Sequence, residues 1–178
     1  MFLREHSYLR VAAEPRAAPA ANRTVVRLSP VSFQVADAEN ARRSNLALLI
    51  GAFLALAVGL FATGVGLDRD RAFYPTVTLA IASYYCLFAV MGASTNALAL
   101  ESLAATGFLA AAVLGFRRSL WIVVAALAAH GVFDLVHSRI ISDPGVPAWW
   151  PEFCLTYDLA AAGYMAWLLK SGRLRAAT

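Results

Sequence analysis

Long apolar stretches separated by short polar connections dominate the chain from residue 45 onward. Four of these stretches are long enough to cross the ~30 Å hydrocarbon core of a bilayer as helices, and a fifth is slightly shorter. They cover residues 46–67, 72–92, 97–116, 120–141 and 153–169. The pattern predicts an all-α membrane protein, a bundle of about five transmembrane helices between residues 45 and 170.

The ends of the chain follow a different pattern. Residues 1–44 are polar and rich in Ala, Pro and Arg, which predicts a disordered tail, and residues 171–178 form a short C-terminal tail. Within the first tail, VSFQV at 31–35 alternates apolar and polar residues. Such alternation is typical of a short strand.

Composition supports a membrane protein and excludes a nucleic-acid-binding one. Hydrophobic residues make up 60% of the chain and charged residues 15%, whereas soluble domains are about half apolar and a quarter charged. The net charge is +4, but no basic run exceeds two residues and no aromatic residues are interleaved. We expect the basic tail to contact anionic membrane lipid. The distribution of Arg and Lys predicts a cytoplasmic C-terminus.

Five acidic or histidine residues interrupt the predicted spans. They are Glu101 in the third span, His130, Asp134 and His137 in the fourth, and Asp158 in the fifth. A charged side chain at the centre of a bilayer costs about 2.5–3.5 kcal/mol on insertion scales. Each of these residues therefore requires a compensating interaction inside the bundle.

Helical geometry predicts that these five side chains meet. At about 100° per residue, His130, Asp134 and His137 share one narrow face of their helix. The ends of the third, fourth and fifth spans that are nearest to these residues lie at the same membrane surface. At ~1.5 Å per residue, Glu101 and Asp158 lie roughly 6–11 Å below that surface, as do Asp134 and His137, and His130 lies deeper. We therefore predict one shared site.

Small and polar residues surround the predicted site in the sequence. Small side chains let helices approach closely in lipid, and they occur near Glu101 and after Asp158 as Ala97, Ala104, Ala105, Gly107, Ala161, Ala162 and Gly163. Further polar atoms are available from Tyr84, Tyr85, Asn96, Cys154 and Tyr157.

Several kinds of chemistry fit such a site. His130, Asp134, His137 and Glu101 form a nitrogen and oxygen ligand set suited to Zn or non-haem Fe. Glu101, His130, Asp134 and Asp158 could instead perform metal-free acid–base catalysis. Both alternatives describe an intramembrane enzyme acting on a lipid-soluble small molecule. A third is a non-catalytic accessory subunit whose buried pairs set helix packing, and a fourth is a small transporter that carries protons or solutes.

Four sequence segments carry a resemblance to known proteins. AHGVFDLVH and PAWWPEFCLTYDLAAAGY, with ASYYCLFAVMG and ALESL upstream, resemble a group of small bacterial multi-pass membrane proteins of unknown function. The resemblance covers roughly residues 68–169 and leaves out the N-terminal tail. It implies a bundle of four or five spans in the bacterial plasma (inner) membrane, and it brings no activity, cofactor or protein partner.

Overall fold

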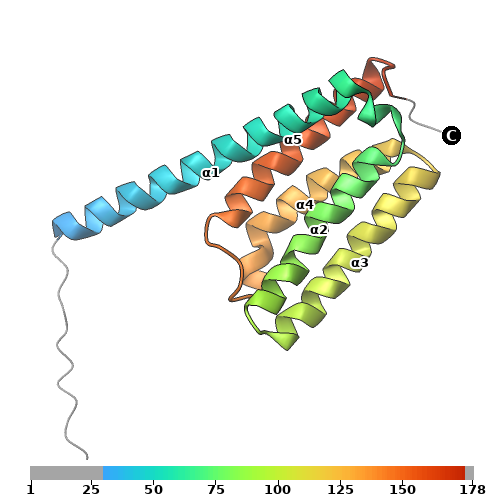
Figure 1. The fold of residues 1–178 in the computed structure, drawn as a ribbon. Helices are drawn as coiled ribbons and strands as arrows, with labels where there is room; N and C mark the ends of the chain where they lie inside the picture. Colours follow the sequence, from blue (N-terminus) through green and yellow to red (C-terminus); the bar gives the residue numbers. More distant parts are fainter. Residues whose placement is uncertain (1–29, 175–178) are drawn as a thin grey trace, which may run out of the picture.

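The computed structural model describes residues 30–174, with side chains from residue 38 onward, and their regular structure is entirely helical (Figure 1). This confirms the predicted all-α class. The helices are α1 (Pro30–Val65), a short 3₁₀ turn η1 (Leu67–Arg69), α2 (Phe73–Met91), α3 (Thr95–Arg117), α4 (Leu120–Ile140) and α5 (Trp150–Lys170).

The first helix begins earlier than expected. α1 starts at Pro30, so the short strand predicted at residues 31–35 is wrong for this segment, which is helical. A lone strand would leave its backbone N–H and C=O groups without a partner, whereas a helix satisfies them within the segment. The first part of α1 extends past the other helices (Figure 1). Residues 1–29 of the predicted tail lie outside the described residues.

Four helices of the described chain are long and apolar enough to span a membrane, namely α1 from Ala38 to Val65, α2, α3 and α4. α5 has the same length as α4, 21 residues, but is less apolar, and Asp158 lies within it. α5 packs between α1 and α4 (Figure 1). Neighbouring helices therefore shield its polar residues from lipid.

The surface and the core of the bundle match a lipid environment. Phe53, Leu103, Met91 and Leu135 are each more than half exposed, and so much exposed apolar surface is unusual for a soluble monomer. Inside, α4 and α5 contribute fully buried aliphatic side chains, among them Leu127, Met165 and Leu168. The exposed apolar side chains are therefore suited to contact with the hydrocarbon of a membrane. The bundle also has a packed core of its own.

Two short connections lie at one end of the bundle, and their local chemistry explains their shape. Ser94 caps α3 because its hydroxyl accepts a hydrogen bond from the Ala97 N–H at 3.2 Å. In the α4–α5 connection, Asp143 accepts a bond from the Gly145 N–H at 2.9 Å. Gly145 packs directly on the backbone of Phe88, where a Cβ atom would overlap the carbonyl oxygen. The connection is thereby held against the end of α2.

Candidate His/carboxylate site

All five acidic and histidine residues of the predicted spans are buried in the bundle. The exposed fraction of Glu101, His130, Asp134, His137 and Asp158 is 2% or less in each case. Three helices supply them: α3 carries Glu101, α4 the two histidines and Asp134, and α5 Asp158. The ionisable residues thus face one another and not lipid, which is the compensation that their burial requires.

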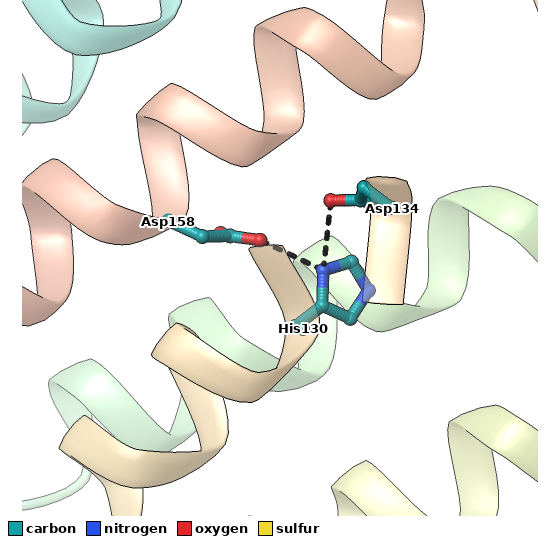
Figure 2. A group of neighbouring side chains, drawn as sticks. All are labelled: His130, Asp134 and Asp158. Carbon is teal, nitrogen blue, oxygen red and sulfur yellow. Dashed lines mark hydrogen bonds and ion pairs between the residues drawn. The ribbon is translucent and has the colours of Figure 1, made fainter. Parts of the chain in front are cut away.

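His130 lies between two carboxylates (Figure 2). Its Nδ1 atom is 2.7 Å from Oδ2 of Asp158 on α5 and 3.5 Å from Oδ2 of Asp134, one turn along α4. Both carboxylates therefore lie close to the same ring nitrogen of His130. A single proton on Nδ1 can make a short hydrogen bond to only one of them, and the shorter distance assigns that bond to Asp158.

Gly131 makes the approach of α5 to α4 possible. A Cβ atom at this position would lie 3.1 Å from the Leu155 carbonyl oxygen and 3.2 Å from Cβ of Asp158. From the sequence, other small residues, among them Gly107 and Gly163, were expected to bring the helices together. A Cβ atom on either of these two glycines would meet nothing within 4 Å, so neither lies at a close helix contact. The close helix contact at the site therefore depends on the glycine next to His130.

His137 and Glu101 form a second pair beside the first group. Nε2 of His137 is 2.6 Å from Oε1 of Glu101, which joins α4 to α3. Two turns of α4 thus carry two histidines that reach opposite neighbours: His130 contacts α5 and His137 contacts α3. The five predicted residues converge, but they do so as a trio and a pair.

Tyr85 of α2 connects the trio with the pair. Its hydroxyl donates a hydrogen bond of 2.6 Å to Oδ1 of Asp134. Its ring stacks on His137, with ring centroids 4.1 Å apart and an interplanar angle of 24°. One buried side chain therefore holds Asp134 and His137 in fixed positions relative to each other.

Phenylalanine rings cover the two imidazoles. Phe108 contacts His130 edge to face at a centroid distance of 4.7 Å, and Phe133 contacts His137 at 5.5 Å. These rings separate the polar groups from lipid and lower the local dielectric constant, which strengthens every charge interaction in the site.

The charges of the site do not balance. Glu101, Asp134 and Asp158 together carry three negative charges when ionised, and two histidines supply at most two positive ones. Within the described residues, the ion pairs of these carboxylates are all with histidine. A buried charge without compensation is strongly unfavourable. An additional proton or a bound cation is therefore needed to balance the negative charge of the site.

Unpartnered oxygen atoms show where a cation would fit. Among the described residues, Oδ2 of Asp134 and Oδ1 of Asp158 are buried and lack a hydrogen-bond partner. His130, Asp134 and Asp158 each offer a ligand atom, and the three atoms lie within 4.8 Å of one another. A group of one imidazole and two carboxylates with this spacing can hold a metal ion.

A polar cavity leads to the site from the α4–α5 connection. Its volume is about 400 Å³, and its walls include Asp134 and His137 as well as Ser138, Ser142, Asp143 and Glu152. Oδ2 of Asp143 and Oε2 of Glu152 are buried and have no hydrogen-bond partner in the described part of the chain. The polar cavity therefore borders the site at Asp134 and His137, at the end of the bundle where the α4–α5 connection lies.

Sequence reasoning identified some of these contacts and missed others. It placed Tyr85 near the site as a source of polar atoms but did not assign it a contact. It gave no role to Asp143 and Glu152, which lie between the predicted spans 120–141 and 153–169 in a segment that contains three prolines. The expected metal ligands were His130, Asp134, His137 and Glu101. The structure groups Asp158 with the first two and pairs His137 with Glu101.

The fold and this site define a membrane-type helical bundle with a buried histidine and aspartate cluster. Comparison with protein families, with curated proteins and with solved structures finds no match for the chain.

Proposed function

We propose that the chain is a membrane-embedded enzyme whose His130, Asp134 and Asp158 bind a divalent metal ion, Zn or Fe, and that it acts on a lipid-soluble substrate. The observation that carries this proposal is the grouping of three potential ligand atoms within 4.8 Å from two packed helices. The uncompensated negative charge of the site supports it, because a divalent cation would remove that charge.

The donor set favours a borderline metal. Imidazole nitrogen suits Zn and Fe, and carboxylate oxygen is accepted by both. A metal held by only three protein ligands keeps a coordination position for water or for a substrate oxygen. Bound there, the metal would act as a Lewis acid and lower the pKa of a coordinated water molecule.

The remaining residues have distinct roles in this proposal. Tyr85 is a positioning residue, because its hydroxyl holds Oδ1 of Asp134 and leaves Oδ2, which has no hydrogen-bond partner, beside His130. His137 lines the polar cavity and is paired with Glu101, so it could exchange a proton with a molecule bound there. A carboxylate that orients an imidazole is a common arrangement for general acid–base catalysis.

Metal analysis of the detergent-purified protein tests the proposal. We expect one Zn or Fe per chain, and we expect Asp158→Asn and His130→Gln to lose it. Asp70→Asn, a change of an exposed carboxylate in the α1–α2 connection, is the matched control and should keep the metal. His137→Gln should also keep it, since His137 belongs to the neighbouring pair. A folded wild-type protein that takes up neither metal would contradict the proposal.

A second candidate function is proton transfer by a non-catalytic membrane protein. It is favoured by the hydrogen bonds and ion pairs that link Asp158, His130, Asp134 and Tyr85, and by the hydrogen-bonded pair of His137 and Glu101 beside them. In proteoliposomes with an imposed membrane potential, this function requires proton uptake that Asp158→Asn abolishes. Metal-free protein with such uptake would favour this candidate over the enzyme. A bacterial plasma-membrane location remains part of either proposal.

A further inference from the structure

A second and larger cavity adjoins the polar one. It has a volume of about 750 Å³ and is lined mainly by apolar residues of α1 and of the start of α5, including Leu46, Ala47, Ile50, Trp149 and Phe153. Leu46, Ile50 and Trp149 are about half exposed. A groove with these walls provides an apolar surface of the kind that a hydrocarbon chain can cover.

The two cavities meet at a common wall. Ala148 and Glu152 line both of them. The apolar groove and the polar cavity therefore lie side by side, and the lining of the polar cavity includes Asp134 and His137. The apolar groove and the adjacent polar cavity together match an amphiphilic molecule, which has a hydrocarbon chain at one end and a polar headgroup at the other.

The walls of the polar cavity also favour one sign of headgroup charge. Asp143 and Glu152 each present a buried oxygen without a partner, and Asp134, which is 1% exposed, adds a third carboxylate to the cavity wall. No lysine or arginine is found among the described residues that line this cavity. Arg43 lines the groove, but its guanidinium is paired with Glu39 at 2.6 Å. The unpartnered acceptors suit an ammonium or hydroxyl group, and they repel a carboxylate or phosphate.

We infer that the two cavities together bind one amphiphilic lipid, with its hydrocarbon chain in the groove of α1 and α5 and an amine-bearing headgroup in the polar cavity. This inference rests on the proposed function, because it names the substrate class of the same site. The headgroup would lie beside Asp134 and His137, where the proposed metal and the acid–base pair are positioned to act on it.

Quenching of tryptophan fluorescence by brominated amphiphiles tests the inference. The experiment uses a variant with Trp121→Phe and Trp167→Phe, which leaves Trp149 and Trp150 at the cavity end of the bundle as the only two of the four tryptophans. The probes are a long-chain amine, the alcohol and the carboxylate, all with the same brominated chain. We expect the amine to reach half-maximal quenching at a roughly fivefold lower concentration than the carboxylate, as one favourable charge contact would give.

Two further variants separate headgroup recognition from chain recognition. Glu152→Gln should remove most of the preference for the amine. Ile50→Gln, in the groove, should weaken quenching by all three probes. Leu49→Gln is its matched control, because Leu49 is also exposed on α1 but does not line the groove, and it should have no effect.

Equal quenching by all three probes, unchanged in Ile50→Gln, would overturn the inference, since general contact with surrounding lipid gives that result. The metal content of the same samples keeps the two proposals distinguishable. A metal-free protein that still prefers the amine contradicts the metal site alone, whereas a metal-bound protein without any preference contradicts the lipid site alone.

Discussion

Removal of a single hydroxyl group, in Tyr85→Phe, tests whether the buried polar contacts hold the bundle together. The hydroxyl donates to Oδ1 of Asp134 at 2.6 Å, and neither residue is more than 2% exposed. Water cannot replace the lost donor in such a place. The phenylalanine ring keeps the stack on His137, so the substitution isolates the hydrogen bond.

The size of the effect follows from the acceptor and from the surroundings. A hydrogen bond to a charged group contributes about 1.5–3 kcal/mol to stability. Bonds between transmembrane helices have measured contributions up to ~1.7 kcal/mol, because the unfolded chain in a membrane also finds partners. We therefore expect Tyr85→Phe to lower the free energy of unfolding by about 1.5 kcal/mol.

Reversible unfolding in mixed detergent micelles, followed by circular dichroism, measures this free energy. Tyr84→Phe is the matched control. Tyr84 precedes Tyr85, is 43% exposed, and its ring contacts Trp150. The control should change stability by less than ~0.5 kcal/mol, as surface substitutions do. If Tyr85→Phe were as stable as Tyr84→Phe, the hydroxyl bond would have no structural role and the proposed positioning of Asp134 would be wrong.

Two further predictions concern helix contacts at the site. We expect Gly131→Val to lower the free energy of unfolding by about 1–3 kcal/mol through overpacking against α5, and to weaken metal binding; Gly107→Val, which meets open space, is the control in the same unfolding and metal assays. We expect His137→Leu to cost about 3–5 kcal/mol, because it leaves the Glu101 carboxylate buried and unpaired. The double variant with Glu101→Leu should recover most of that loss, and a purely additive result in the unfolding assay would argue against the pair.

The sequence contained enough information to bring the five ionisable residues together. Helix periodicity aligned His130, Asp134 and His137, and the distance of Glu101 and Asp158 from their helix ends placed them at the same depth. These quantities depend only on the rise and twist of a helix, which hardly vary. The long apolar stretches likewise sufficed to predict an all-helical membrane bundle.

The grouping of those residues could not be obtained in the same way. Whether Asp158 or Glu101 contacts His130 depends on how α3 and α5 are rotated relative to α4. Several small residues at the helix contacts determine this rotation together. Gly131 of α4 makes close contact with α5, whereas Gly107 of α3 and Gly163 of α5 make no close contact with a neighbouring helix, and nothing in their sequence surroundings distinguishes them. The roles of Asp143 and Glu152 depend on the shape of a connection that Gly145 holds against α2.

X-ray absorption spectroscopy of the metal-loaded protein tests the central claim most directly, because it identifies the ligand atoms. The proposed centre predicts one imidazole nitrogen together with carboxylate oxygens at ~2.0–2.2 Å for Zn, and an unchanged spectrum in His137→Gln, which should keep the metal. Sulfur ligation, which would point to Cys154 or Cys86, would contradict this centre, as would a folded protein that retains no metal at all.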